Sequence, residues 1–216
     1  MLATPQTAML PPDTALTFFA ASVLLGLSPG PDNVFVLTQS ALRGVRAGLL
    51  VTLGLCTGLI VHTLLVAFGV AAIFQASDLA FNALKFAGAA YLLYLAWQAW
   101  RAPASEIRLE QAAGPSAGKL YRRGIVMNIT NPKVSIFFLA FLPQFADPAR
   151  GSLAPQIMAL GCVFMLAALL VFGAMACFSG AFGQLLQRSA RGQRWLNRLT
   201  ALVFVGLALR LASLQR

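Results

Sequence analysis

Acidic residues are scarce in this chain of 216 residues, and charge of either sign is uncommon. Six Asp and Glu stand against sixteen Lys and Arg, charged residues make up 10% of the chain, and 59% of it is apolar. So few polar groups cannot cover a soluble globule of this size, and the composition predicts a membrane protein surrounded by a lipid bilayer. The net charge of +10 invites comparison with nucleic-acid binders. However, the basic residues lie between apolar blocks and form no amphipathic stripe with aromatic residues, so we expect no nucleic-acid partner.

Histidine and cysteine are also rare. The single histidine, His62, and the three cysteines, Cys56, Cys162 and Cys177, all lie inside apolar segments without CxxC spacing. This pattern predicts buried thiols instead of disulfides or a metal site. A metal-ion exporter would need several His, Cys or carboxylate ligands at one place, so that alternative is weak, and we expect neither a metal nor a cofactor. No hydrolase, metalloprotease or nucleotide-binding motif occurs, and an enzyme is not predicted.

Basic residues are missing from the start of the chain, where no Lys or Arg precedes Arg43. A secretory signal peptide has a positively charged first region. We therefore expect the first apolar segment to be a retained helix.

Six apolar blocks follow one another, each near or above the roughly 20 residues that a bilayer core requires. They cover residues about 15–42, 47–74, 79–100, 124–145, 153–182 and 195–214. The sequence thus predicts an all-α membrane protein that forms one transmembrane domain of six helices. The second and fifth blocks are free of charge, whereas the first contains Asp32 and the fourth Lys133.

The first block is interrupted where a membrane helix should be continuous. Two prolines, a glycine and a carboxylate lie within it, in the run Ser28, Pro29, Gly30, Pro31, Asp32, Asn33. Broken helices are tolerated in a membrane where they are buried in protein or line a wet cavity, and a carboxylate at that depth is a functional-site candidate.

The fourth block has a similar interruption, which contains Asn128, Asn131, Pro132 and Lys133. The polar stretch 101–123 separates the two interrupted blocks and divides the chain into repeat 1, about 15–100, and repeat 2, about 124–214. Three helices per half would make the second half run inverted relative to the first, as in transporters built from inverted repeats.

Basic residues in the short loops predict the orientation, because cytoplasmic loops carry an excess of Lys and Arg. Eleven of them fall in the loops after the first, third and fifth blocks, and four on the other side. We therefore expect both termini outside and the stretch 101–123 in the cytoplasm.

Each proline after a break suits the first position of a resumed helix, where its missing N–H has no cost. Pro31 and Pro132 have this place, and Asn131 is a plausible N-cap for the second helix. Asp32 lies eleven residues before Arg43 and Lys133 ten after Arg123, so the two charges are predicted at one depth, either facing each other across a cavity or hydrated separately on its two sides. The alternative is that the prolines are simple kinks, which membrane helices tolerate.

His62 has two interpretations that the sequence leaves equal. It can relay protons, because its side chain titrates near neutral pH, or it can be a neutral hydrogen-bonding group between helices. On the same helix, Gly54 and Gly58 have the spacing of a close helix contact.

Five motifs in order resemble the LysE family of bacterial amino-acid exporters, in its RhtB branch. They are Ser28-Pro-Gly-Pro-Asp32-Asn33, Gly44-Val-Arg46-Ala-Gly48, Lys85-Phe-Ala-Gly88-Ala-Ala-Tyr91, Asn128-Ile-Thr-Asn131-Pro132-Lys133 and Trp195-Leu-Asn-Arg-Leu-Thr. The resemblance implies a cytoplasmic-membrane exporter of amino acids or derivatives such as homoserine or its lactone. It further implies coupling to an ion gradient, with a proton expected, and a possible homodimer. Leu59 departs from that pattern, since an acidic residue often follows the glycine equivalent to Gly58.

Two further alternatives remain. A thiol redox carrier of related architecture would have cysteines beside the breaks, where this chain has Ser28 and Thr130. An accessory subunit without transport activity is the other. The mechanism we expect is alternating access in which Asn131 and Lys133 bind the carboxylate of the substrate and Asp32 binds its ammonium group or a coupling proton.

Overall fold

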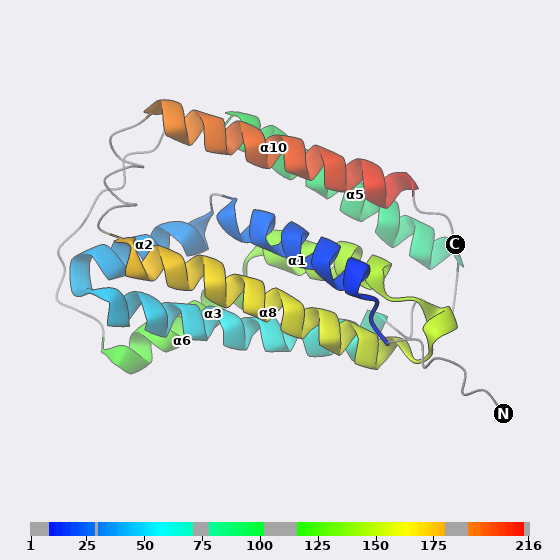
Figure 1. Ribbon diagram of the computed structural model, residues 1–216, viewed down its shortest axis with the longest axis horizontal. Helices are drawn as coiled ribbons and strands as arrows, with labels where there is room; N and C mark the ends of the chain where they lie inside the picture. The colour runs from blue at the N-terminus through cyan, green and yellow to red at the C-terminus, as the bar shows by residue number, and fades with distance from the viewer. Residues whose placement is uncertain (1–8, 29, 71–77, 102–115, 180–189, 214–216) are drawn as a thin grey trace.

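The computed structural model describes residues 9–28, 30–70, 78–101, 116–179 and 190–213, and every regular element in these ranges is a helix (Figure 1). The all-α class predicted from the sequence is confirmed. Most helices run along the long axis of the molecule, and consecutive long helices turn back at its ends.

Two helices are long and apolar enough to cross a membrane by themselves. One is α3 (Val45–Leu65), which continues into the short π-helix η1 (Val66–Val70), and the other is α8 (Leu153–Cys177). They correspond to the second and fifth apolar blocks, which the sequence analysis singled out as free of charge.

Two further spans are formed by pairs of helices that meet at a bend, if each pair is counted as one span. α1 (Pro12–Leu27) and α2 (Pro31–Arg43) meet at 65°, while α6 (Ala117–Ile129) meets the helical run from α7 (Pro132–Ile136) at 50°. That run continues through the π-helix η2 (Phe137–Phe141) and the 3-10 helix η3 (Leu142–Phe145). The predicted breaks are therefore confirmed, and they are true bends with no continuous helix across them.

Proline starts both resumed helices, as predicted. Pro31 is the first residue of α2 and Pro132 the first residue of α7, where their missing N–H groups leave no hydrogen bond unmade. Pro29 lies outside the described residues.

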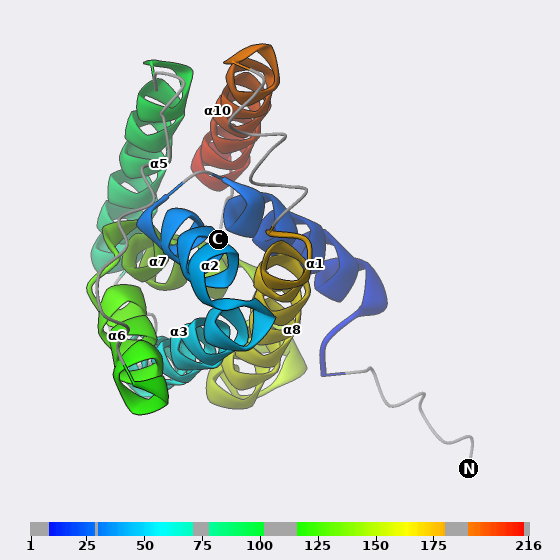
Figure 2. The same ribbon diagram turned by 90° about the vertical axis from the view of Figure 1, so that its left-hand side faces the viewer.

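The remaining long helices, α5 (Asp78–Arg101) and α10 (Ala190–Ser213), pack against each other beside the other helices (Figure 2). Each has 24 residues, which corresponds to about 36 Å of helix. Neither reaches the apolar content that marks α3 and α8. Length and composition thus identify two to four spans, and the count of six remains a proposal.

The predicted linker, about 101–123, overlaps the start of a helix. α6 begins at Ala117, and its first turns carry Lys119, Arg122 and Arg123. Lysine and arginine are good helix formers, and three basic residues on an exposed turn are compatible with a helix that extends beyond the membrane.

Close approach of α3 and α6 depends on glycine. A side chain at Gly54 would collide with the backbone of α6 at Tyr121 and Gly124, and a Cβ at Gly58 would lie 2.7 Å from Cβ of Asn128. The predicted contact face of Gly54 and Gly58 is confirmed.

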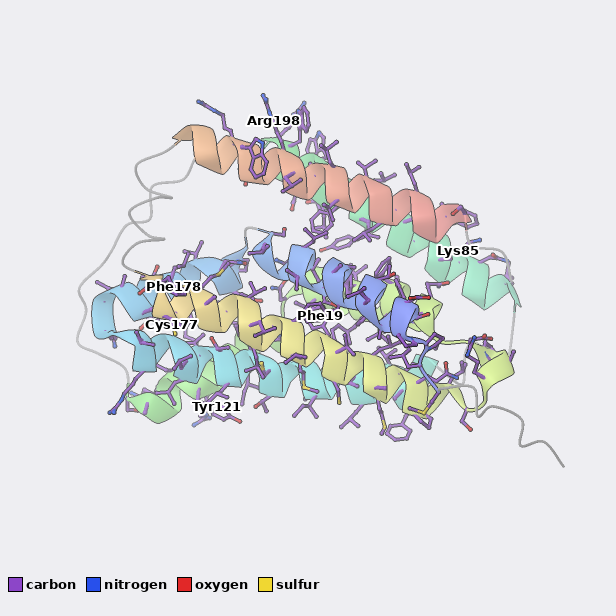
Figure 3. The ribbon with its side chains drawn as sticks, in the orientation of Figure 1. Phe19, Lys85, Tyr121, Cys177, Phe178 and Arg198 are labelled. Carbon is purple, nitrogen blue, oxygen red and sulfur yellow. The ribbon has the colours of Figure 1, made fainter. Side chains whose placement is uncertain are left out.

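The outer surface of the bundle is apolar. Large exposed hydrophobic side chains occur along α3, α8 and α10, including Leu53, Leu65, Leu166, Leu170, Leu202 and Leu209. Such a surface requires an apolar environment. The prediction that all three cysteines are buried is wrong for two of them: Cys56 is buried, but Cys162 and Cys177 are exposed on this surface, and Cys177 lies beside Phe178 near one end of α8 (Figure 3). An apolar environment outside the protein makes exposed thiols acceptable there.

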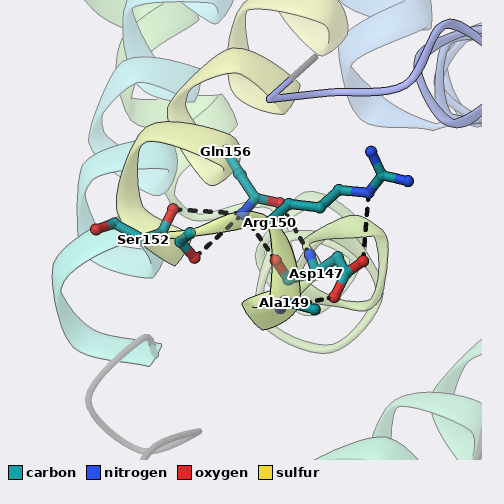
Figure 4. Close-up of polar contacts among 6 residues, drawn as sticks. Asp147, Ala149, Arg150, Ser152 and Gln156 are labelled. Atoms are coloured by element: carbon teal, nitrogen blue, oxygen red, sulfur yellow. Dashed lines mark hydrogen bonds and ion pairs between the residues drawn. The ribbon is translucent and has the colours of Figure 1, made fainter. Parts of the chain in front are cut away.

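A compact turn joins η3 to α8 (Figure 4). Asp147 caps the 3-10 helix η4 (Pro148–Arg150) through the N–H of Ala149 and forms an ion pair with Arg150. The buried Gln156 side chain accepts from the N–H of Asp147 at 2.8 Å and donates to its carbonyl at 2.9 Å. One amide group from α8 therefore fixes the path of the turn.

Candidate functional site

Asn131 connects the two breaks. Its Oδ1 accepts from the N–H of Lys133 at 3.0 Å and so caps α7, as predicted. Its Nδ2 donates to Oδ2 of Asp32 at 2.7 Å, and this hydrogen bond joins the second break to the first. A single amide therefore starts one half-helix and holds the carboxylate that lies in the first turn of the other.

Lys133 makes the reverse connection. Its side chain is 9% exposed, and Nζ donates to the carbonyl oxygens of Leu25 and Ser28 at 3.3 and 3.0 Å. These carbonyls end α1, where the last turn of a helix has no N–H donors left for its carbonyl oxygens and carries partial negative charge. A buried ammonium group thus caps the C-terminal end of the first half-helix.

Gly30 allows this arrangement. A Cβ at this position would lie 3.1 Å from Nζ of Lys133, which is tight for a buried charged group. The glycine therefore leaves space for the ammonium group beside the break.

Asn33 closes the first break on its other side. Its Nδ2 donates to the carbonyl oxygen of Gly26 at 2.6 Å and lies 3.7 Å from Sδ of Met175 on α8. The bend between α1 and α2 is therefore fixed from two directions, by Asn33 within the first half and by Lys133 from the second.

A small cavity lies where these residues meet. Its polar walls come from Ser22, Asp32, Asn128 and Lys133, and its apolar walls from Leu25, Gly26, Leu59, Val134, Phe164, Ala168 and Phe172. It offers about 20 Å³ to the centre of a water molecule. That is room for one or two waters and too little for a larger solute.

Two acceptors on the cavity wall have no hydrogen-bond partner within the described part of the chain. They are Oδ1 of Asp32 and Oδ1 of Asn128, and each residue is 2% exposed. An unsatisfied buried acceptor costs about 1–3 kcal/mol. The two oxygens therefore mark a place where a donor from a solute or water is needed.

The structure gathers most of the predicted site residues, each in a distinct place. Asp32, Asn128 and Lys133 line the cavity, Ser28 contributes a carbonyl oxygen, and Asn131 holds Asp32. Asp32 and Lys133 line the same cavity, while their common depth in the membrane stays a prediction. No ion pair within 4.0 Å joins these two side chains, since Asn131 contacts one and the end of α1 contacts the other.

His62 lies beside the site and not on the cavity wall. Its Nε2 is 3.2 Å from the backbone oxygen of Asn128, and its ring packs against Phe138. This geometry corresponds to the interhelical hydrogen bond, one of the two interpretations that the sequence left equal.

The apolar cavity wall has no signature in the sequence. Phe164 and Phe172 belong to α8, an uninterrupted apolar helix, and nothing in its sequence distinguishes these residues from those that face outward. Ser22 gave no signal either, because a single serine in a membrane helix commonly bonds its own backbone, as Ser22 does at 2.7 Å to Phe18.

Aromatic rings pack together around Phe164, which lines the cavity. Phe18 of α1 contacts Phe137 and Phe145, with ring centroids 5.9 and 5.1 Å apart, and Phe164 lies 5.0 Å from Phe138. These residues are fully or almost fully buried.

Two broken membrane helices that meet at a buried polar cavity are characteristic of secondary transporters. The comparison with known proteins agrees with this class. The sequence model of the LysE type translocators matches residues 23–215, and the chain belongs to this family. It is therefore a multi-pass membrane protein of a translocator family.

Several relatives match over nearly their whole length. The chain is 35% identical to the homoserine/homoserine lactone efflux protein of Salmonella typhimurium, over 91% of this chain and 94% of the relative. It is 34% identical to the protein of the same name in Salmonella typhi, with the same coverage. An uncharacterized membrane protein of Vibrio cholerae is 33% identical over 92% of this chain and 96% of its own. No solved structure matches.

Proposed function

We propose that this protein exports a small amino acid, or a close derivative such as homoserine or homoserine lactone, across the bacterial cytoplasmic membrane. The curated relatives with this activity in their names support the substrate class. In the proposed mechanism the protein alternates between inward-open and outward-open states, and the step is coupled to an ion gradient, with the proton as the expected ion.

The observation that carries the proposal is the arrangement of charge in the cavity. Asp32 and Asn128, each with an unsatisfied buried oxygen, line the same small cavity as Lys133. A zwitterion has donors for the oxygens in its ammonium group and an acceptor for Lys133 in its carboxylate. The apolar walls from Leu59 and Phe172 suit a short apolar side chain of the substrate, once the cavity opens.

The packing supports an inverted repeat of three helices per half. α3 packs against α6, the first part of the second broken span, and α8 packs against α1, the first part of the first. α5 packs against α10. If the two halves are exchanged, α1 corresponds to α6, α3 to α8 and α5 to α10. The α3–α6 contact then becomes the α8–α1 contact, and the α5–α10 contact is unchanged. A duplicated unit is expected to have this property. We propose six spans with both termini outside.

Reconstitution tests the function directly. Purified protein in vesicles loaded with unlabelled homoserine should accumulate labelled homoserine by counterflow, and vesicles without the protein should not. Asp32→Asn should lose gradient-driven export while it remains folded, because Asn keeps the volume of Asp but exchanges no proton. Asp13→Asn, which changes an exposed carboxylate at the start of α1, is the matched control and should transport normally.

The outcomes separate the alternatives. If no amino acid or lactone crosses the vesicle membrane, the exporter proposal fails and the accessory-subunit alternative gains. If Asp32→Asn exports against a gradient as well as the wild type does, Asp32 has no part in coupling.

A further inference from the structure

The position of the Lys133 ammonium group is unusual for a membrane lysine. Lysine near the end of a membrane helix normally extends its charge to the interface. Lys133 is buried at the second break, and its Nζ lies against the carbonyl oxygens of Leu25 and Ser28 at the end of α1. The charge is therefore held inside the protein by the first half-helix.

Carbonyl oxygens at the end of a broken helix form a cation site. In transporters with such helices, unwound backbone carbonyls and the C-terminal ends of half-helices coordinate the sodium ion or the proton carrier. Here the carbonyl oxygens are present, the partial negative charge of the helix end is present, and the Asp32 carboxylate is near enough to attract the same positive charge. The ammonium group of Lys133 supplies that charge.

An ammonium group has three N–H donors. Two of them contact Leu25 and Ser28, which leaves one for the cavity that Lys133 lines. A group in this place contacts the helix end on one side and the space for a substrate on the other. A bound metal cation between a helix end and a substrate carboxylate would have the same two contacts.

We propose that Lys133 is a covalently attached resident cation: its ammonium group occupies a cation site formed by the Leu25 and Ser28 carbonyls and presents its remaining donor to the carboxylate of the substrate. The part that concerns the substrate rests on the proposed function. Transport then needs no sodium or potassium ion, and truncation of Lys133 leaves a vacant site for a small cation with N–H donors.

The first test uses purified protein without substrate. Lys133→Ala removes three methylene groups and the ammonium group, which propylammonium replaces. Because a ligand stabilises the folded state that binds it, propylammonium should raise the melting temperature of Lys133→Ala by about 2–4 °C near saturation. Tetramethylammonium has the same charge but no N–H donor and should not.

The controls are the wild type, whose site is filled, and Lys85→Ala. Lys85 is also a buried lysine, 6% exposed, but it lies on α5 and its Nζ sits 4.6 Å from the ring of Phe86. Neither protein should respond to propylammonium. An equal response in Lys85→Ala, an equal response to tetramethylammonium, or no response in Lys133→Ala overturns the proposal.

The second test uses the wild type, so it tests the proposal even if Lys133→Ala does not fold. Its transport rate in vesicles should be unchanged when choline replaces sodium and potassium on both sides. A requirement for either alkali ion overturns the proposal. The first test contains no substrate, so it remains valid if homoserine is not transported. A failure of the cation-site proposal can therefore be distinguished from a failure of the proposed export function.

Discussion

Asn131 offers a way to measure how strongly the two breaks are joined. Its side chain caps α7 and also donates to Asp32. Asn131→Ser retains an N-cap oxygen, since Ser and Asn are nearly equal in that position, but it is too short to replace the bond to Asp32. Asn131→Ala removes both contacts.

The magnitudes follow from these two contacts. Loss of an N-cap costs about 1 kcal/mol, and loss of a hydrogen bond to a charged acceptor about 1.5–3 kcal/mol. Bonds between membrane helices average only about 0.6 kcal/mol. The carboxylate acceptor places the bond to Asp32 above that average. We expect Asn131→Ser to lower the free energy of unfolding by about 1–3 kcal/mol and Asn131→Ala by about 1 kcal/mol more.

A double-mutant cycle isolates the bond itself. Asp32→Leu removes the acceptor, so Asn131→Ser should cost little in that background, and the coupling energy should be about 1–3 kcal/mol. Unfolding in mixed micelles by added SDS, followed by circular dichroism, gives the four free energies. A coupling energy below about 0.5 kcal/mol would refute the inference that Asn131 holds Asp32.

Three further predictions concern packing, specificity and orientation. Gly58→Ala should lower both the melting temperature and the transport rate, because its Cβ would press on Asn128. Gly118→Ala meets nothing within 4 Å and should leave both unchanged or slightly improved. Lys133→Gln should raise the apparent KM for homoserine about tenfold or more and that for homoserine lactone much less, since the lactone has no free carboxylate; equal changes would remove Lys133 from carboxylate binding. With the three native cysteines replaced, Ser152→Cys should react with a membrane-impermeant thiol reagent in intact cells and Ser116→Cys should not, and the reverse result would invert the orientation.

The breaks were predictable because proline and charge in an apolar run leave few alternatives. Pro31 and Pro132 fit the first position of a helix, and the capping preference of Asn131 is a local property of its side chain. The sequence could not show that the same Asn131 amide also reaches Asp32, 99 residues away, because that contact depends on how the halves pack.

The prediction that Asp32 and Lys133 lie on one cavity is confirmed, but the predicted direct opposition of the two charges was incomplete. Counting residues along two helices places both charges at one level. It cannot show that the end of α1 offers carbonyl oxygens nearer to Lys133 than the carboxylate is. The apolar wall and the aromatic cluster around Phe18 and Phe164 were missed for a similar reason, since inward-facing and lipid-facing residues have the same composition in a membrane helix.

The hydrogen bonds between the two breaks also determine which chemical groups a substrate needs. Three hydrogen bonds lead from the second break to the first, one from Asn131 to Asp32 and two from Lys133 to the end of α1. At about 1.5–3 kcal/mol for each bond to or from a charged group, their sum exceeds the roughly 4 kcal/mol that a ligand of millimolar affinity releases. Binding alone therefore supplies too little free energy to separate the halves with these groups left unpaired. A substrate that supplies new partners lowers that cost: an ammonium group donates to Asp32, and a carboxylate accepts from the remaining donor of Lys133. This exchange favours a zwitterion over a neutral solute of the same size, and it places the selectivity for charge at the residues that join the two breaks.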